Sequence, residues 1–449
     1  MSTRNELKRK ACEAIEKRKN ELIAVAKMIL ENPETGFSEA KTSRLVAREF
    51  DLRGIPYRDR LALTGVKGEI KGGRGPGPKV SVIGEMDALL VSEHASADSK
   101  TGAAHACGHH AQIGMMLGAI TGLQVPEVLS HLSGSIVPFA VPAEEFVQVE
   151  RRMALRDQKR IEFLSGKQEL IRLGEFDDVD MAIMCHTASD MVKSTFAVGG
   201  TSNSHVVKYI EFIGKGAHAG GSPHLGINAL NAAAWSIMAV HANREVFPES
   251  ETVRLHGIIG HGGESVSAVP SDVRLEWRVR SATPEAVARN STKIDQCFKA
   301  GALAVGAKVK ITTIPGYMPM SNNSSLQGLF KQNAQALVGK DKVVQMPPNR
   351  NRGGSTDMGD LSQIIPACHP YTAGAVGAGH SKDYTITDYE MAVVNPAKIM
   401  AMVVIDLLAD GAAGAKEVLE GWQPAMTKDQ YLAFQRDRAQ VVEFDGGEV

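Results

Sequence analysis

The stretch AAHACGHHAQIGMMLGAI, residues 103–120, places possible metal ligands at the start of an apolar helical run. Cys107 and His109 are separated by one residue there. A thiolate and an imidazole are both ligands for zinc and similar divalent ions. Each residue also has an ordinary explanation, because a single cysteine is commonly a small buried residue and a histidine can simply begin a helix. The pair therefore indicates a metal site only if other ligands join it.

Four other sites follow apolar runs or occupy tight turns, where an α/β sheet displays its ligand groups. They are Asp87, the doublet Glu144–Glu145, His186 and His380. Together with the first pair they offer thiolate, imidazole and carboxylate donors, a set that suits zinc, manganese or a similar ion. In the doublet, one carboxylate can bind the ion while its neighbour takes a proton from water and delivers it to the leaving group. A helix N-terminus, which favours negative charge, is the alternative explanation for the doublet.

The composition narrows the class of protein. A chain of 449 residues exceeds one ordinary domain, so two domains or one large insertion are expected. The net charge is −1 and no basic stripe occurs, so we expect no nucleic-acid partner. The chain has no apolar run of about 18 residues, so we expect no membrane span. The charged N-terminus does not resemble a signal peptide, and five scattered cysteines do not indicate disulfides, so we expect a cytoplasmic protein.

The elements that must position these residues follow from the hydrophobic pattern. Helical spacing covers residues 5–31 and a second helix ends at Gly54, while a further helix starts at about His109. Apolar strands alternate with these helices, which predicts an α/β fold with a mixed central sheet. From about residue 201 to 316 the pattern changes to alternating strands and two helices, a smaller α+β unit. We therefore divide the chain at 1–200, 201–316 and 317–449, with the middle part inserted into the first domain.

Six motifs occur in the order found in one known family. They are MDAL, HACGH, PAEE, GKGAHAGGSPHLGINAL, VSAVPSDV and GSTDMGDLSQIIP. This set, within about residues 32–405, resembles the aminoacylase/carboxypeptidase family of metallo-exopeptidases. The most similar branch is the amidohydrolases of N-acyl amino acids, which include indole-acetyl-amino-acid and aminobenzoyl-glutamate hydrolases. The resemblance implies a metal-binding α/β domain interrupted by a smaller lid domain, through which two chains form a homodimer.

The resemblance also implies roles for single residues. One or two divalent ions, manganese or zinc, would be held by five side chains: Cys107, His109, Glu145, His186 and His380. Cys107 would bridge the ions if two bind, and Glu144 would be the general base. Asp87 would orient a ligand histidine. His218, in GAHAGG, matches a lid histidine that reaches across the dimer in relatives to stabilise an oxyanion, although a turn-capping histidine is the alternative.

Substrate binding has three candidates. Arg280 and Arg289 are candidates to hold a substrate carboxylate, because a planar guanidinium can form two parallel bonds to it. A solvated face is the ordinary place for either arginine. His110, beside the ligand histidine, is the third candidate.

The chain departs from the family pattern around the ligand core. The usual acid and second histidine after HACGH are replaced by His110, Ala111 and Gln112. Glu85 stands where carboxypeptidase relatives carry a ligand histidine, and Phe146–Val147 replaces a glycine pair after PAEE. A charged helical stretch, residues 150–169, follows, and we place it near the pocket mouth. These changes question an ordinary peptide-like substrate, and they favour one metal ion over two or manganese over zinc.

The sequence therefore predicts a metal-dependent hydrolase of a C–N bond in a small substrate that bears a carboxylate. The altered pocket resembles that of nitroanthranilate aminohydrolase, which replaces an aromatic amine with hydroxyl. Two alternatives stay open at this point. One is an amidohydrolase of N-acyl amino acids, aminobenzoyl-glutamate or dipeptides. The other is a non-catalytic member of the fold that binds a ligand or partners a catalytic subunit.

Overall fold

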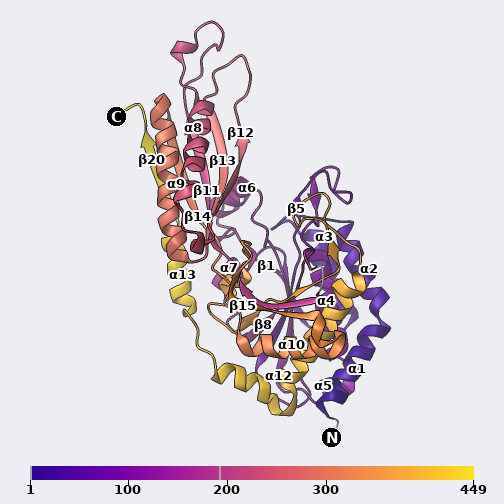
Figure 1. The fold of residues 1–449 in the computed structure, drawn as a ribbon. Coiled ribbons are helices and arrows are strands. Elements are labelled where there is room, and N and C mark those ends of the chain that lie inside the picture. The colour runs from indigo at the N-terminus through magenta and orange to yellow at the C-terminus, as the bar shows by residue number, and fades with distance from the viewer. Residues whose placement is uncertain (1–2, 192–193, 449) are drawn as a thin grey trace.

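The computed structural model describes residues 3–191 and 194–448. The chain forms two bodies (Figure 1): a larger one with a helix-covered central sheet, and a narrower one that projects from it and carries two long helices over a second sheet. The predicted fold class, α/β with a mixed central sheet and a smaller α+β unit, is confirmed.

The central sheet has parallel strands in its middle and antiparallel strands at one side. Its order is β1 (Tyr57–Leu61), β2 (Gly65–Gly68), β7 (Ser135–Val141), β4 (Lys79–Glu85), β8 (Met181–Ile183) and β16 (Ala367–Cys368), and β3 (Ile70–Lys71) also pairs with β7. β7, β4, β8 and β16 run parallel. In β4, Val82 packs into one apolar cluster and Ile83 into another. Both faces of the sheet are therefore covered, which explains the continuous apolar runs.

One face of the sheet is covered by α4 (His109–Leu123), every residue of which is buried. Three helices pack around α4: α1 (Arg4–Lys17), α2 (Lys19–Leu30) and α12 (Asn395–Glu420). The helical spacing predicted over residues 5–31 is thus two helices that meet at Arg18. Among the described residues, only 390–420 is apolar and long enough to cross a membrane, and 83% of its most apolar stretch is buried inside the protein, as in a core helix.

The opposite face is covered by α6 (Val149–Asp157), α7 (Gly166–Leu173) and α13 (Lys428–Asp437). Leu170 and Ile171 of α7 and Tyr431 of α13 share one apolar cluster with Phe139 of the sheet. The charged stretch 150–169 was expected near the pocket mouth. Its first part forms α6, where the exposed Glu150 pairs with Arg274, whereas its last residues enter α7, where Lys167 is fully buried.

The projecting body is an antiparallel sheet with two helices on one face. Its order is β12 (Arg254–His261), β13 (Asp272–Ser281), β11 (Ser204–Ile213), β14 (Lys308–Pro315) and β20 (Gln440–Asp445), with α8 (Ala229–Ala242) and α9 (Pro284–Val305) packed on it. We call this body the lid. The division at residues 201 and 316 remains a prediction. The structure differs from it in one respect, because β20 of the last segment pairs with β14 of the lid.

A third sheet combines strands that precede the lid in the chain with strands that follow it. It consists of β15 (Val343–Asn351), β10 (Phe196–Thr201), β17 (Tyr371–Thr372) and β9 (His186–Thr187). The remaining elements are α3 (Ala40–Leu52), α5 (Pro126–Leu129), α10 (Ser324–Val338), α11 (Met358–Leu361), β5 (Leu89–Leu90), β6 (Ala103–Ala104), β18 (Ala375–Val376), β19 (Thr385–Ile386) and five short turns of helix. The third sheet brings His186 beside the end of the central sheet.

Candidate active site

The predicted metal ligands come from loops and element ends that the backbone bends towards one point. Gly108, between Cys107 and His109, has φ 97°, and a Cβ there would collide with the Thr187 hydroxyl. This position therefore requires glycine, and it lets the thiol and the imidazole beside it face the same side. His380 also has a left-handed backbone, with φ 64°.

The five predicted ligands converge in the structure. Cys107 Sγ lies 3.4 Å from His186 Nε2, and Glu145 Oε1 lies 3.3 Å from His380 Nε2. They form two groups of three residues that could each hold a metal ion. One is Cys107 with His109 and His186, and the other is Cys107 with Glu145 and His380. Within each group the ligand atoms all lie within 4.8 Å of one another. Cys107 belongs to both groups, so its sulfur is the donor that the two groups share.

Buried polar atoms without hydrogen bonds show that this donor set fits a divalent ion. His109 Nε2 and Glu145 Oε1 are both buried and make no hydrogen bond. The other ring nitrogens are occupied, since His109 Nδ1 lies 2.8 Å from the carbonyl oxygen of Asp87 and His186 Nδ1 lies 2.7 Å from that of Thr187. Ligand histidines commonly have this arrangement, with one nitrogen fixed by the protein and the other free for the metal.

Asp87 holds the two halves of the site together. Its Oδ1 accepts the backbone N–H of Glu144 at 3.1 Å and its Oδ2 accepts that of Glu145 at 2.8 Å. Its Oδ1 is also 3.3 Å from His109 Nδ1. The structure thus places Asp87 behind a ligand histidine, where it also orients both carboxylates of the doublet.

The electrostatics of the site favour a cation. Burial raises the pKa of Cys107 well above its usual value, and Glu145 raises it further, so the thiolate needs a positive partner. Burial lowers the tendency of His109 to hold a proton, but Glu85 and Cys107 outweigh it and raise the pKa of His109. The site is therefore rich in acids that a divalent ion would balance.

Glu144, the predicted base, lies beside the predicted ligands. Burial raises its pKa well above the usual value, and the nearby Glu85 and Glu145 add to this effect. A raised pKa makes a carboxylate a stronger proton acceptor near neutral pH. Its Oε2 lies 4.0 Å from His109 Nε2, and its backbone carbonyl accepts a short hydrogen bond from the Tyr317 hydroxyl.

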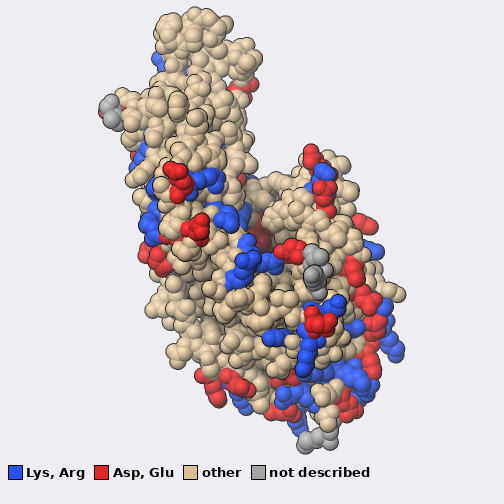
Figure 2. All heavy atoms as spheres, viewed as in Figure 1, with Lys and Arg blue, Asp and Glu red and all other residues tan. Residues whose placement is uncertain are grey.

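A cavity of about 180 Å³ opens onto these groups between the lid and the larger body. In Figure 2 the surface is hollowed where the two bodies meet, and acidic and basic side chains are interspersed around it. Cys107, Glu144, Glu145, His186 and His380 line one side of the cavity.

Arginines line the other side of the cavity. Arg280, as predicted, is one of them, and its Nε is buried without a hydrogen bond. Arg278, two residues earlier on β13, and Arg352 also line it, although neither was predicted. Arg352 lies over the ring of Tyr371, 5.1 Å from its centroid. Three arginines therefore line the cavity with the predicted ligands; Arg352 also pairs with Asp190, and Arg278 also donates to the carbonyl oxygen of Phe146.

The structure does not bring three predicted residues to this cavity. Arg289 lies on the exposed side of α9 and pairs with Glu251. His110 points into the core, 3.3 Å from the Tyr389 hydroxyl, and burial lowers its pKa to about 3. His218 is exposed in the lid, where its Nδ1 accepts the N–H of Gly221 at 2.8 Å. Its predicted role across a dimer stays a prediction, whereas Arg289 and His110 are corrected as substrate contacts within one chain.

Aromatic residues that sequence reasoning missed form the walls of the cavity. Phe146, Tyr317, His369 and Tyr371 all line it. His369 is buried with an unpaired Nε2, and burial lowers its pKa to about 3, so it is neutral. The substitution of Phe146 for the family's glycine was the one available signal for this wall.

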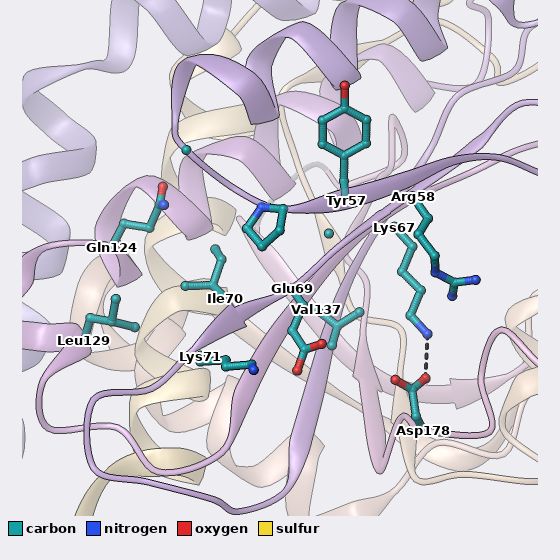
Figure 3. Close-up of a pocket in the computed structure, with 13 residues that line it drawn as sticks. Tyr57, Arg58, Lys67, Glu69, Ile70, Lys71, Gln124, Leu129, Val137 and Asp178 are labelled. Atoms are coloured by element: carbon teal, nitrogen blue, oxygen red, sulfur yellow. Dashed lines mark hydrogen bonds and ion pairs between the residues drawn. The ribbon is translucent and has the colours of Figure 1, made fainter.

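A larger concavity, about 730 Å³, lies at the outer edge of the central sheet. Figure 3 shows its residues, which include Tyr57 and Ile70, and the ion pair of 2.5 Å between Lys67 and Asp178. None of the predicted site residues lines it, so size alone does not identify the reactive centre.

Comparisons with known proteins agree with this geometry. The model of peptidase family M20/M25/M40 matches residues 82–405. The Xaa-Arg dipeptidase of Mus musculus is 27% identical over 426 residues, which cover 90% of this chain and 89% of the relative. The IAA-amino acid hydrolase ILR1-like 2 of Arabidopsis thaliana is 29% identical and covers 77% of this chain and 75% of its own length.

A crystal structure from Bacillus subtilis, described as a dinuclear metal binding peptidase of the M20 family, superimposes with a TM-score of 0.60 at 22% identity. It covers 86% of this chain and 97% of its own, and it therefore supports the fold. The chain belongs to peptidase family M20/M25/M40, and the predicted resemblance to metallo-exopeptidases that hydrolyse carbon–nitrogen bonds is confirmed.

Proposed function

We propose that this protein hydrolyses the C–N bond of a small substrate that bears a carboxylate, with an aromatic amine such as a nitroanthranilate as the favoured class. The observation that carries the proposal is the cavity itself, which is lined by predicted metal ligands and Glu144 together with Arg278 and Arg280. A guanidinium can hold a carboxylate by two parallel bonds, which would direct the rest of the substrate towards Glu144.

The metal would be held by Cys107, His109, Glu145, His186 and His380, as one or two manganese or zinc ions. When bound, such an ion supplies Lewis-acid activation of water and of the reacting carbon. Glu144 accepts a proton from the attacking water and returns it to the departing nitrogen. Water attacks the carbon, the C–N bond breaks, and ammonia or an amine leaves while a hydroxyl or carboxyl group remains.

The size of the cavity favours a small aromatic acid over a long peptide. Pockets for drug-sized ligands measure about 300–1,000 Å³, whereas this one measures about 180 Å³. Phe146 and Tyr371 line it and offer flat faces to an aromatic ring. The second candidate is an amidohydrolase of N-acyl amino acids or aminobenzoyl-glutamate. It is supported by the similarity to the plant IAA-amino acid hydrolase.

The assembly and the setting are part of the proposal. We expect a cytoplasmic homodimer through the lid, in which His218 of one chain would complete the cavity of the other. Exposed apolar side chains of the lid, such as Trp235 and Met238 on α8, supply a surface for this contact.

A metal assay and a substrate panel test the proposal. The purified protein should contain a divalent ion, and a chelator should abolish turnover. Substituted anthranilates, N-acyl amino acids, aminobenzoyl-glutamate and dipeptides should be compared, with release of ammonia or amine as the readout. Turnover on anthranilates identifies the favoured class, and turnover on acyl substrates alone favours the second candidate. A protein without metal that hydrolyses none of them would be the non-catalytic ligand-binding or partner subunit.

A further inference from the structure

A lysine is buried beside the catalytic carboxylate without being a ligand. Lys167 of α7 has no exposed side-chain surface, and its Nζ lies 2.5 Å from Glu85 Oε1 and 2.5 Å from Asp357 Oδ1. Asp357 Oδ2 is held by the Ser165 hydroxyl at 2.7 Å and by the backbone N–H of Lys167 at 3.0 Å. Because a buried charge is costly unless it is paired, this cluster has a specific electrostatic role.

Glu85 connects the lysine to the metal site. Its Oε2 accepts the Gln112 side-chain N–H at 2.8 Å and lies 3.2 Å from His109 Nε2, the nitrogen that faces the metal. Glu85 thus contacts both Gln112 and Lys167, and all three belong to departures from the family pattern. Through Glu85 this unit reaches His109 Nε2, the same nitrogen that faces Glu144.

The space around this nitrogen offers a third position for a cation. Ligand atoms of Glu85, His109 and Glu144 lie within 4.8 Å of one another, apart from the two groups that share Cys107. A divalent ion at this position would take both the free nitrogen of His109 and the carboxylate of Glu144. It would share His109 with the Cys107–His109–His186 group, would leave the Cys107–Glu145–His380 group complete, and would take the base from the reaction.

The ammonium of Lys167 already balances the acids of this third position. Burial disfavours its charge, but Asp357 and Glu85 outweigh burial and raise the pKa of Lys167, so it is charged at neutral pH. A fixed positive charge beside Glu85 and near Glu144 repels a divalent ion.

We propose that Lys167 is a positioning residue that excludes a divalent ion from the Glu85–His109–Glu144 group and so leaves Glu144 free to act on water. The inference rests on the proposed metal-dependent hydrolysis. It concerns which position the metal occupies, so it is separable from the identity of the substrate.

The test compares Mn²⁺ binding by the wild type, Lys167→Met, and Lys167→Met combined with Glu85→Gln. Mn²⁺ is titrated into metal-depleted protein, and bound ions per chain are counted by calorimetry and elemental analysis. Lys208→Met is the matched control, because Lys208 is also buried and pairs with Asp295 at 2.7 Å, but within the lid. Circular dichroism checks folding of every variant with and without Mn²⁺.

Lys167→Met should bind one Mn²⁺ per chain more than the wild type, and excess Mn²⁺ should inhibit its turnover at least tenfold. The double variant and Lys208→Met should each bind the same number of Mn²⁺ ions per chain as the wild type. An unchanged count in folded Lys167→Met overturns the inference. So does a Lys167→Met chain that stays unfolded even with Mn²⁺, since the lysine would then only balance charge. A wild type without metal or turnover refutes the proposed function instead.

Discussion

Asp87→Asn is the sharpest test of how the site is organised. Each oxygen of Asp87 accepts one backbone N–H, from Glu144 and from Glu145. An asparagine amide has one acceptor oxygen, so one of these N–H groups would face the NH₂ group and lose its partner. The variant keeps the shape of the side chain, and its effect therefore reports on hydrogen bonds and charge.

The structure sets the size of the effect. An unpaired buried N–H costs about 1–3 kcal/mol, and His109 also loses a charged neighbour 3.3 Å from its Nδ1. Part of this cost lowers the stability of the metal-depleted protein. The rest should lower the affinity for the ion that His109 and Glu145 are proposed to bind. We expect metal affinity to fall about 10–100-fold, which corresponds to about 1.4–2.7 kcal/mol.

The assay is calorimetric titration of Mn²⁺ or Zn²⁺ into metal-depleted protein, combined with urea unfolding of the same sample. Asp178→Asn is the matched control, because Asp178 is also hydrogen-bonded, to Lys67 and Lys79, but at the far edge of the sheet (Figure 3). The control should lose stability only. If folded Asp87→Asn binds metal within threefold of the wild type, the role assigned to Asp87 is wrong.

Three further outcomes are expected. Glu144→Gln should retain its metal but lose turnover by about 10² or more, because the base is removed; near-normal turnover would reject that role. Arg280→Met should raise KM for a carboxylate substrate about 10–100-fold, whereas Arg289→Met, the exposed control, should not. Burial raises the pKa of Asp360 to about 7, so the native state holds a proton that the unfolded chain has released between about pH 4 and 7. Its contribution to the unfolding free energy should fall with rising pH by up to about 1.4 kcal/mol per unit, and urea titrations of Asp360→Asn across this range should show a flatter slope.

The convergence of the predicted ligands could be expected only from their combination, because each residue alone has an ordinary explanation. Cys107 and His109 precede an apolar helix, and the glutamate doublet follows a buried strand. Parallel strands bring such ends to one edge of the sheet, so the local pattern suggests a shared site, and the family resemblance adds the roles. Their contacts, such as that between Glu145 and His380, could be expected only from the family resemblance, since 235 residues separate them.

The arginines of the cavity could have been predicted more completely from the alternation of residues in β13. In β13, Val273, Leu275, Trp277 and Val279 are buried in the lid core, so the alternating residues, including Arg278 and Arg280, share the opposite face. That period of two identifies Arg278 together with Arg280. Arg289 instead belongs to a helix, whose period carries its side chain away from the site.

The lysine could not be predicted, because no local pattern distinguishes it. Lys167 is one charged residue in a charged segment, and its partners Glu85 and Asp357 lie 82 and 190 residues away in the chain. Its burial depends on α7 packing against the face of the sheet opposite α4. Tertiary packing of this kind overrides the expectation that a charged stretch is solvated.

The C-terminal segment ties the geometry of the cavity to the angle of the lid. The chain enters the lid at β11 and leaves it after β14, and the Arg438 side chain donates to the carbonyl oxygens of His205, at 2.7 Å, and Gly316, at 3.3 Å. One guanidinium thus holds both crossings, while β20, a few residues later, extends the lid sheet. Because Arg278 and Arg280 reach the cavity from the lid, a small rotation at the crossings would displace them from the metal side. Productive geometry tolerates only about 0.5 Å of such displacement, so, if these arginines hold the substrate as proposed, its position depends on Arg438 and β20, which follow all the predicted site residues in the chain.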